Sequence, residues 1–335
     1  MLTRLQTTLI AIALALLLTA CAAPQSRNLL RDRPAHIPAR VELTQTPFFP
    51  QERYQCGPAA LAMALGAADV DIEPEQIVTQ VYLPERQGSL QVEMLASARR
   101  NQTLAYELAP LLDDLLGEVA AGNPAIVLQN LGLSWSPRWH YAVVVGYDLE
   151  AGEILLRSGL ERRQTMRLHT FEHTWARSGH WAMLALPPGQ IPATAKEATY
   201  AKAAVTFEST GFNTSANAIY ATGLSRWPKN FAARMGLGNT AYALNDLDAA
   251  TAAFHQAAID HPDAAAAHNN LAHVLHQQRH FEAALTSARQ AVALGGPLEE
   301  TARATLAEIE ASMASRQRHP AANWVAEAVE LTRNR

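Results

Sequence analysis

The chain of 335 residues has few cysteines and few charges, and each shortage excludes a class of protein. Its two cysteines, Cys21 and Cys56, are too few for a disulfide-rich scaffold, so each needs its own explanation. Charged residues make up 17%, the formal net charge is −4 and no basic patch stands out, which argues against a nucleic-acid partner. The hydrophobic share of 49% is enough for buried cores, and the length predicts two domains.

Residues 1–20 have the pattern of an export signal peptide. Arg4 is followed by an apolar run over 9–18, which is too short to remain as a membrane-spanning helix. The segment ends in Leu-Thr-Ala before Cys21, and this tetrapeptide resembles the bacterial lipobox. The resemblance implies that Cys21 is diacylated, becomes the N-terminus and anchors the chain in a membrane. Ala22, where Asp would retain the protein in the inner membrane, implies sorting to the outer membrane of a Gram-negative cell envelope, facing the periplasm.

Residues 21–40 are predicted to form a flexible tether, because they are rich in Pro and Arg. Residues 41–189 have an α+β pattern that ends at Pro-Pro-Gly. Helices mostly precede strands, which is the order of a helical lobe that packs on an antiparallel sheet. The expected helices cover 56–65, 73–81, 89–100 (with Ser89 as N-cap) and 110–121, and the expected strands cover 103–108, 125–129, 140–147, 153–157, 164–168 and 181–186.

Residues 190–335 contain a repeat with a period of 34 residues. Alanine recurs at this spacing, and the position four residues after each alanine is either aromatic or alanine. The aligned sets are Ala216, Ala250 and Ala284, and Tyr220, Phe254 and Ala288. The pattern resembles the tetratricopeptide repeat, with three repeats over about 197–298 and capping helices over 299–316 and 320–332. The resemblance implies an all-α solenoid, whose concave surface is suited to a protein or an extended peptide.

Chemistry is predicted at two separate motifs of the first domain. Cys56 precedes Gly-Pro-Ala-Ala at an expected helix start, where unpaired backbone N–H groups and the helix dipole favour the thiolate that nucleophilic catalysis requires. His140 begins a strand of sequence His-Tyr-Ala-Val-Val-Val-Gly-Tyr-Asp and is the expected base and acid. Gln51, five residues before the cysteine, is a candidate oxyanion donor together with the backbone N–H of Cys56.

Gln51, the Cys-Gly pair at 56–57 and the strand that begins at His140 resemble the bacteriocin-processing, double-glycine cysteine peptidases, a branch of the papain-like group. The resemblance covers roughly 47–186. It implies a papain-like α+β fold with Cys56 as the nucleophile, His140 as the base and Gln51 as the oxyanion donor.

The third catalytic position departs from that family. Its members carry Asp or Asn near the end of the next strand, where this chain has Ser158. A hydroxyl accepts a hydrogen bond from imidazole but supplies no charge, and loss of the charged residue costs a serine-protease triad about 10⁴ in rate. Cysteine enzymes depend less on this group. Asp148 and Glu161 are alternatives, but Asp148 lies at the far end of the strand that carries His140, so Ser158 is favoured.

The sequence therefore predicts a membrane-anchored cysteine peptidase that cleaves a peptide or amide bond through a thioester, with repeats that recruit a protein partner or substrate. The alternatives are a catalytically lapsed adaptor that binds peptides, and acyl or amide transfer by the same pair. No transporter segment or phosphate-binding loop is present, so the substrate is not inherited from the family. No cofactor is expected, and His169, His173 and His180 lack a metal-ligand pattern. Trp135 and Trp139 flank His140 and either wall a substrate groove or pack on the sheet.

Overall fold

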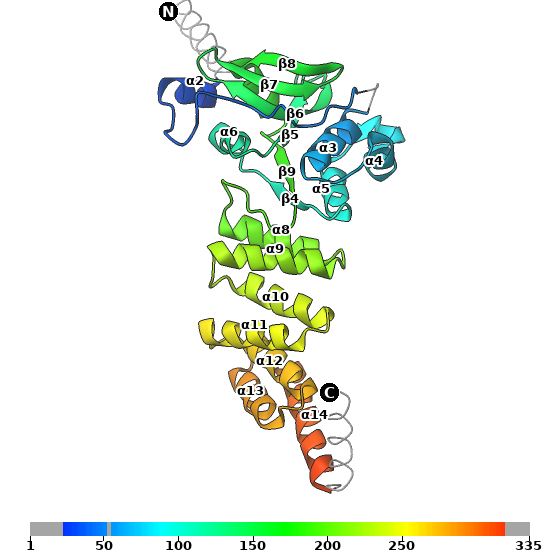
Figure 1. Cartoon of the computed structure of the whole chain (residues 1–335), viewed down its shortest axis with the longest axis vertical. Coiled ribbons are helices and arrows are strands. Elements are labelled where there is room, and N and C mark those ends of the chain that lie inside the picture. Colours follow the sequence, from blue (N-terminus) through cyan, green and yellow to red (C-terminus); the bar gives the residue numbers. More distant parts are fainter. Residues whose placement is uncertain (1–22, 52–54, 319–335) are drawn as a thin grey trace, which may run out of the picture. The chain divides into compact units, whose positions relative to one another are not determined.

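The computed structural model describes residues 23–51 and 55–318 (Figure 1). The predicted signal peptide, Cys21 and the predicted second capping helix lie outside the described residues. The chain divides into two compact units, Met1–Ala203 and Ala204–Arg335, and each is described by itself. None of the helices in the described residues is long and apolar enough to cross a membrane.

The first unit is built on an antiparallel sheet, as predicted. Over the described residues the sheet has seven strands, in the order β4-β9-β5-β6-β7-β8, and β1 pairs with β6 outside that path. The strands are β1 (Arg40–Glu42), β4 (Leu104–Glu107), β5 (Ala125–Asn130), β6 (Trp139–Asp148), β7 (Glu153–Ser158), β8 (Glu161–Arg167) and β9 (Ala182–Leu186). A separate hairpin pairs β2 (Tyr82–Leu83) with β3 (Gly88–Ser89), and a 3₁₀ turn (Pro84–Arg86) connects them.

Helices cover both faces of this sheet. Helices α3 (Cys56–Ala67), α4 (Pro74–Val81) and α5 (Gln91–Arg100) gather on one side, and α6 (Leu112–Ala120) lies on the other (Figure 1). Helix α3 is apolar on all sides because it is enclosed in the core, where it packs with Ile126, Val143 and Met183 of the sheet. The predicted helical lobe on an antiparallel sheet is therefore confirmed.

The prediction of a flexible tether over 21–40 is wrong for the described part of that segment. Helix α2 (Pro24–Arg31) docks on the first unit, and Leu29 and Ile37 are buried. The backbone N–H groups of Gln25 and Ser26 donate to the Glu172 carboxylate at 2.9 and 2.7 Å. A buried carboxylate thus satisfies the helix N-terminus and complements its dipole. The partner lies more than a hundred residues away, so the composition of the segment gave no sign of it.

Two further differences concern local structure. Ser89 is not the N-cap of α5: it belongs to β3, and the cap position is Leu90. Helix α7 (Leu168–Ala176) was not predicted. It packs beside β5, where Gln129 Nε2 donates to Thr174 Oγ1 at 2.7 Å. Tertiary contacts therefore override weak local signals at both places.

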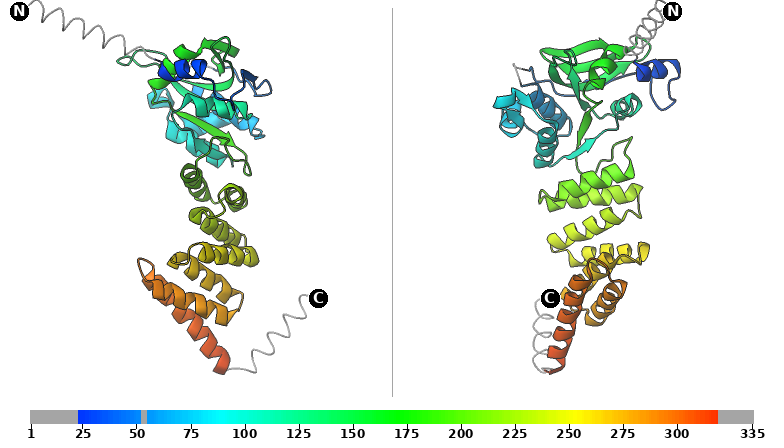
Figure 2. Two further views of the ribbon diagram at one scale, coloured as in Figure 1. Left: turned by 90° about the vertical axis from the view of Figure 1, so that its left-hand side faces the viewer. Right: turned by 180° about the vertical axis from the view of Figure 1, so that it is seen from behind.

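The second unit is a run of helices that pack on their neighbours in sequence. They are α8 (Glu197–Glu208, which contains the division), α9 (Asn213–Arg226), α10 (Phe231–Ala243), α11 (Leu247–Asp260), α12 (Ala265–Gln277), α13 (Phe281–Leu294) and α14 (Glu299–Arg318). Figure 2 shows the antiparallel succession of these helices from behind and from one side. The predicted all-α repeat is confirmed, and the first predicted capping helix corresponds to α14.

The 34-residue period corresponds to buried helix contacts. Ala216, Ala250 and Ala284 are all completely buried, as expected of residues at which helices touch. Gly238 lies so close to α11 that an added Cβ would meet the Phe254 ring at 2.4 Å. The repeat therefore needs small residues for geometric reasons, because each helix pair buries its apolar face only against its neighbours.

Candidate active site

Cys56 is the first residue of α3, which confirms the predicted helix start. Its thiol is partly buried, and burial raises the pKa of Cys56 above its usual value. Backbone hydrogen bonds from Tyr141 and Gly57 act in the opposite direction but do not outweigh burial. The expected thiolate is therefore disfavoured in the free protein, because the charged form loses more by desolvation than it gains from these donors.

Gly57 allows the β2–β3 hairpin to approach the start of α3. A Cβ at this position would lie 2.4 Å from Ser89 Oγ, which is far inside van der Waals contact. The Tyr141 hydroxyl donates to the Ser89 backbone oxygen at 3.2 Å, so the hairpin also contacts β6. Helix α3, the hairpin and β6 thus meet beside Cys56.

His140 is the second residue of β6, and its neighbour Tyr141 contacts the thiol. Burial lowers the pKa of His140, so the imidazole is neutral near pH 7. Its Nε2 lies 2.9 Å from Ser158 Oγ. With Nε2 bonded to the serine, Nδ1 is the nitrogen that remains to exchange a proton with the cysteine.

Of the three residues considered for orienting His140, only Ser158 reaches the imidazole. Ser158 ends β7 and is buried. Asp148 is at the other end of β6, where it pairs with Arg40 and caps the β6–β7 turn. Glu161 is exposed at the start of β8. The geometry thus favours Ser158, the residue that the sequence pattern also favours.

Gln51 is fixed by the tight turn between β7 and β8. Its backbone N–H donates to the Gly159 oxygen at 3.0 Å, and its side-chain Oε1 accepts from the Gly159 N–H at 3.0 Å. Gly159 has a φ of 59°, a left-handed conformation that glycine adopts without strain. The Gln51 Nε2 is buried and has no hydrogen-bond partner among the described residues. A buried amide donor without a partner is costly and points to a ligand group.

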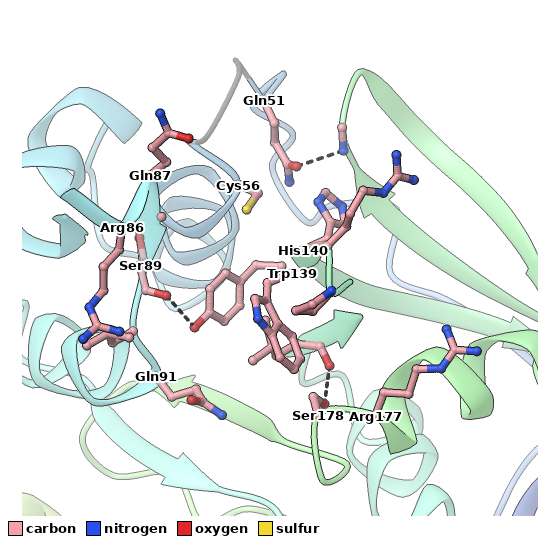
Figure 3. Close-up of a pocket in the computed structure, with 17 residues that line it drawn as sticks. Gln51, Cys56, Arg86, Gln87, Ser89, Gln91, Trp139, His140, Arg177 and Ser178 are labelled. Carbon is pink, nitrogen blue, oxygen red and sulfur yellow. Dashed lines mark hydrogen bonds between the residues drawn. The ribbon is translucent and has the colours of Figure 1, made fainter. Parts of the chain in front are cut away.

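These side chains share one cavity of ≈ 940 Å³. Figure 3 shows Gln51, Cys56 and His140 directed into the same space, with Gln51 bonded to the backbone at the β7–β8 turn. Trp139 lines the cavity, which is one of the two placements expected for the tryptophans that flank His140. Trp135 is 83% exposed and does not pack on the sheet.

Several lining residues were not predicted from the sequence to belong to the site. They are Arg86, Ser89, Arg138 and Arg177, together with Gly159. They lie on separate elements, and only the fold brings them together. Among the described residues, no group of three His, Cys, Asp or Glu side chains is placed to hold a metal ion.

Comparisons with known families find one family in the first part of the chain and another in the second. Residues 43–183 match the Peptidase_C39 like family, and residues 202–254 and 237–299 match the tetratricopeptide repeat. These matches confirm the resemblance of the first domain to this peptidase group and of the second to the tetratricopeptide repeat. No curated protein sequence matches the chain.

Solved structures of both kinds are similar to parts of the chain. A C39-like peptidase from Bacillus anthracis is 18% identical, with a TM-score of 0.37, over 43% of this chain and 96% of that one. The first TPR of Spaghetti (RPAP3), bound to an HSP90 peptide, is 16% identical, with a TM-score of 0.34, over 36% and 94%. The Yersinia enterocolitica type III secretion chaperone SycD, in complex with a peptide of the translocator YopD, is 16% identical, with a TM-score of 0.32, over 34% and 92%.

Proposed function

We propose that this chain, a Peptidase_C39-like domain followed by tetratricopeptide repeats, hydrolyses peptide or amide bonds with Cys56 as nucleophile and His140 as base and acid. One observation carries the proposal. The unpartnered Nε2 of Gln51 enters the cavity that also contains Cys56 and His140. A cavity with a nucleophile, a base and a free buried donor has the three groups that acyl transfer requires.

The reaction begins from a neutral pair, because burial raises the pKa of Cys56 and lowers that of His140. His140 Nδ1 takes the thiol proton as Sγ attacks the carbonyl carbon. The imidazolium then protonates the leaving amine, and the C–N bond breaks to leave a thioester on Cys56. Water, deprotonated by His140, attacks the thioester and releases the acid, and the proton returns to the thiol.

Charge develops on the carbonyl oxygen in both tetrahedral intermediates. The Gln51 Nε2 and the backbone N–H of Cys56 are the donors for it, since backbone N–H groups in the first turn of α3 have no partner within the helix. A donor of this kind typically contributes 10²–10³ in rate. Throughout the cycle the His140 Nε2–H donates to Ser158, which keeps Nδ1 directed at the cysteine.

The adaptor remains the second candidate because Ser158 is neutral. Without a carboxylate, the imidazolium is less stabilised and turnover is slower. The unpartnered Gln51 amide favours the enzyme, since it shares the cavity with a thiol and an imidazole, where an oxyanion would develop during acyl transfer. Transfer of the acyl group to an amine instead of water uses the same residues and gives a different product.

The test compares envelope fractions incubated with the wild-type chain or with Cys56→Ala, followed by mass spectrometry of new N-termini. New termini that appear only with the wild type support hydrolysis, and an added amine on the new C-terminus identifies transfer. Cys56→Ser serves as a matched control that keeps the shape of the side chain. If peptides bind to the wild type and to Cys56→Ala equally, and neither preparation produces new termini, the chain is an adaptor.

We also propose that the chain is exported and held through lipidated Cys21 at the outer membrane, facing the periplasm. The lipobox resemblance supports this, and several acyl methylenes at about 0.8 kcal/mol each give a stable anchor. Cys21→Ala is expected to move the protein from the membrane pellet to the soluble envelope fraction. Unchanged sedimentation would contradict the anchor.

The repeats are proposed to recruit a protein partner or the substrate, since a solenoid exposes a long concave face. The Cys56→Ala variant, with crosslinkers placed on α10 or α12, is expected to capture one partner reproducibly. Equal capture by a variant with the crosslinker on the first unit would contradict recruitment by the repeats.

A further inference from the structure

The charged residues that line the active-site cavity all have the same sign in the described part of the chain. They are Arg86, Arg138 and Arg177, and no Asp or Glu of that part lines the cavity. This is unexpected for a chain with 27 basic and 31 acidic residues. The other ionisable lining groups are Cys56, His140 and Tyr141, whose shifted pKa values all favour the neutral form near pH 7.

The arginines come from different elements and lie around the reacting groups. Arg86 belongs to the 3₁₀ turn of the β2–β3 hairpin, and Arg177 follows α7. Figure 3 shows these two on opposite sides of the cavity, with Trp139 between them. Arg138 directly precedes Trp139 at the start of β6. A chain that crosses the cavity past Cys56 therefore meets cations on both sides of the scissile bond.

Arg177 is held in position by the backbone. Its Nη1 donates to the carbonyl oxygens of Asn130 and Gly132 at 3.2 and 2.7 Å. These carbonyls leave the positive charge uncompensated, because they are dipoles and not anions. A guanidinium positioned in this way keeps its remaining donors for a carboxylate.

From this arrangement we infer that the cavity selects peptides that carry carboxylates on both sides of the cleaved bond. Cleavage of the selected peptide rests on the proposed function, but the attraction of the cavity for anions does not. The three arginines are exposed residues, so the effect is moderate and is screened by salt. Clefts lined by one sign of charge raise the local concentration of the opposite ion.

The first test uses Cys56 itself as the probe and needs no substrate. Two methanethiosulfonates of similar size are compared, one with a sulfonate and one with a trimethylammonium group. In each case the Cys56 thiolate attacks the sulfenyl sulfur, a mixed disulfide forms, methanesulfinate leaves and the thiol proton goes to solvent. Mass spectrometry of the peptide that contains Cys56 gives the two rates, and each is divided by the rate with N-acetylcysteine amide.

The sulfonate reagent is expected to be favoured about tenfold or more at low salt. One charge at roughly 10 Å in water changes the local concentration of an ion about twofold, in opposite directions for the two reagents. Arg86→Gln, Arg138→Gln and Arg177→Gln are each expected to lower the ratio about two- to fourfold, and 0.5 M salt is expected to remove most of it. Arg31→Gln, an exposed arginine in α2, is the matched control and leaves the ratio unchanged.

Arg177→Lys separates charge from structure. Lysine keeps the charge but loses the hydrogen bonds to the two backbone carbonyls. The ratio of the two labelling rates is therefore expected to stay near the wild-type value. The inference is overturned if the wild-type ratio is near one. It is also overturned if none of the three Arg→Gln changes alters the ratio.

The second test distinguishes failure of this inference from failure of the proposed function. Peptides with Glu, Gln or Lys on both sides of the cleaved bond are offered to the full chain. Preferred cleavage of the Glu series supports both claims. Preferred cleavage of the Lys series retains the peptidase and overturns the selectivity. No cleavage of any series, together with a high sulfonate ratio, overturns the peptidase and retains an anion-binding cavity.

Discussion

Replacing Ser158 by Asp is expected to make Cys56 more reactive near neutral pH. Ser158 Oγ lies 2.9 Å from His140 Nε2, so a carboxylate introduced here would face the imidazole directly. A negative charge favours imidazolium, which in turn favours thiolate on the neighbouring cysteine. In the wild type no carboxylate contacts the imidazole among the described residues, and the pair is neutral because burial raises the pKa of the thiol and lowers that of His140.

The size of the effect follows from opposing contributions. A carboxylate about 4 Å from the imidazolium contributes about 4 kcal/mol at an effective dielectric constant of 20. Desolvation of the carboxylate offsets much of this, because Ser158 is only 6% exposed. A net gain of about 1.4 kcal/mol corresponds to a tenfold change. Ser158→Asp is therefore expected to raise the thiolate population about tenfold, and Ser158→Ala to lower activity about threefold to tenfold through the lost hydrogen bond.

The assay measures the rate of Cys56 alkylation by iodoacetamide from pH 5 to pH 10. In the wild type the rate should rise continuously toward the raised thiol pKa, without a shoulder. In Ser158→Asp a shoulder should appear below pH 8, because the ion pair is reactive over the interval between the two pKa values of the pair. Ser158→Asn matches Asp in size without its charge and should show no shoulder.

The outcome that refutes this reasoning is a Ser158→Asp profile that superimposes on that of Ser158→Asn while both proteins unfold at the wild-type temperature. In that case the residue would not control the charge of His140. A wild-type profile with a plateau already present at pH 6 would refute the neutral resting pair instead.

Three further predictions concern other contacts. Gln51→Ala should lower kcat about 10²–10³-fold with little change in KM, measured on any peptide that the wild type cleaves, because it removes the proposed oxyanion donor. Glu172→Ala should release α2 (Pro24–Arg31), because the N–H groups at the start of that helix lose their carboxylate acceptor. The release is measured as faster hydrogen exchange and faster proteolysis of the helix. Protection equal to that in the wild type would contradict the docking role of Glu172. Gly238→Ala should destabilise the repeats by about 1–3 kcal/mol in urea unfolding, because the new methyl overlaps Phe254, and a stabilised variant would show that the contact is relaxed in solution.

Local sequence was sufficient wherever neighbouring residues determine the structure. The start of α3 at Cys56 follows from Pro58 and the small residues after it, and the 34-residue repeat follows from alanines that are completely buried. The strands β5 to β7 were predicted within two residues because short apolar, β-branched runs and the turn signals between them are local features. The proposed nucleophile and the proposed base could be named for the same reason, since Cys56 and His140 each lie at the start of a recognisable element.

Only the tertiary structure decided what surrounds those two residues. Ser158 rather than Asp148 or Glu161 meets the imidazole because of the register of β6 and β7, and Gln51 is held by Gly159 across more than a hundred residues. The docking of α2 depends on the distant Glu172, and the cationic lining depends on arginines from separate elements. These contacts join residues that are far apart in the chain. Their geometry, and the burial that sets the pKa values of the thiol and the imidazole, exist only once the sheet and its helices have packed.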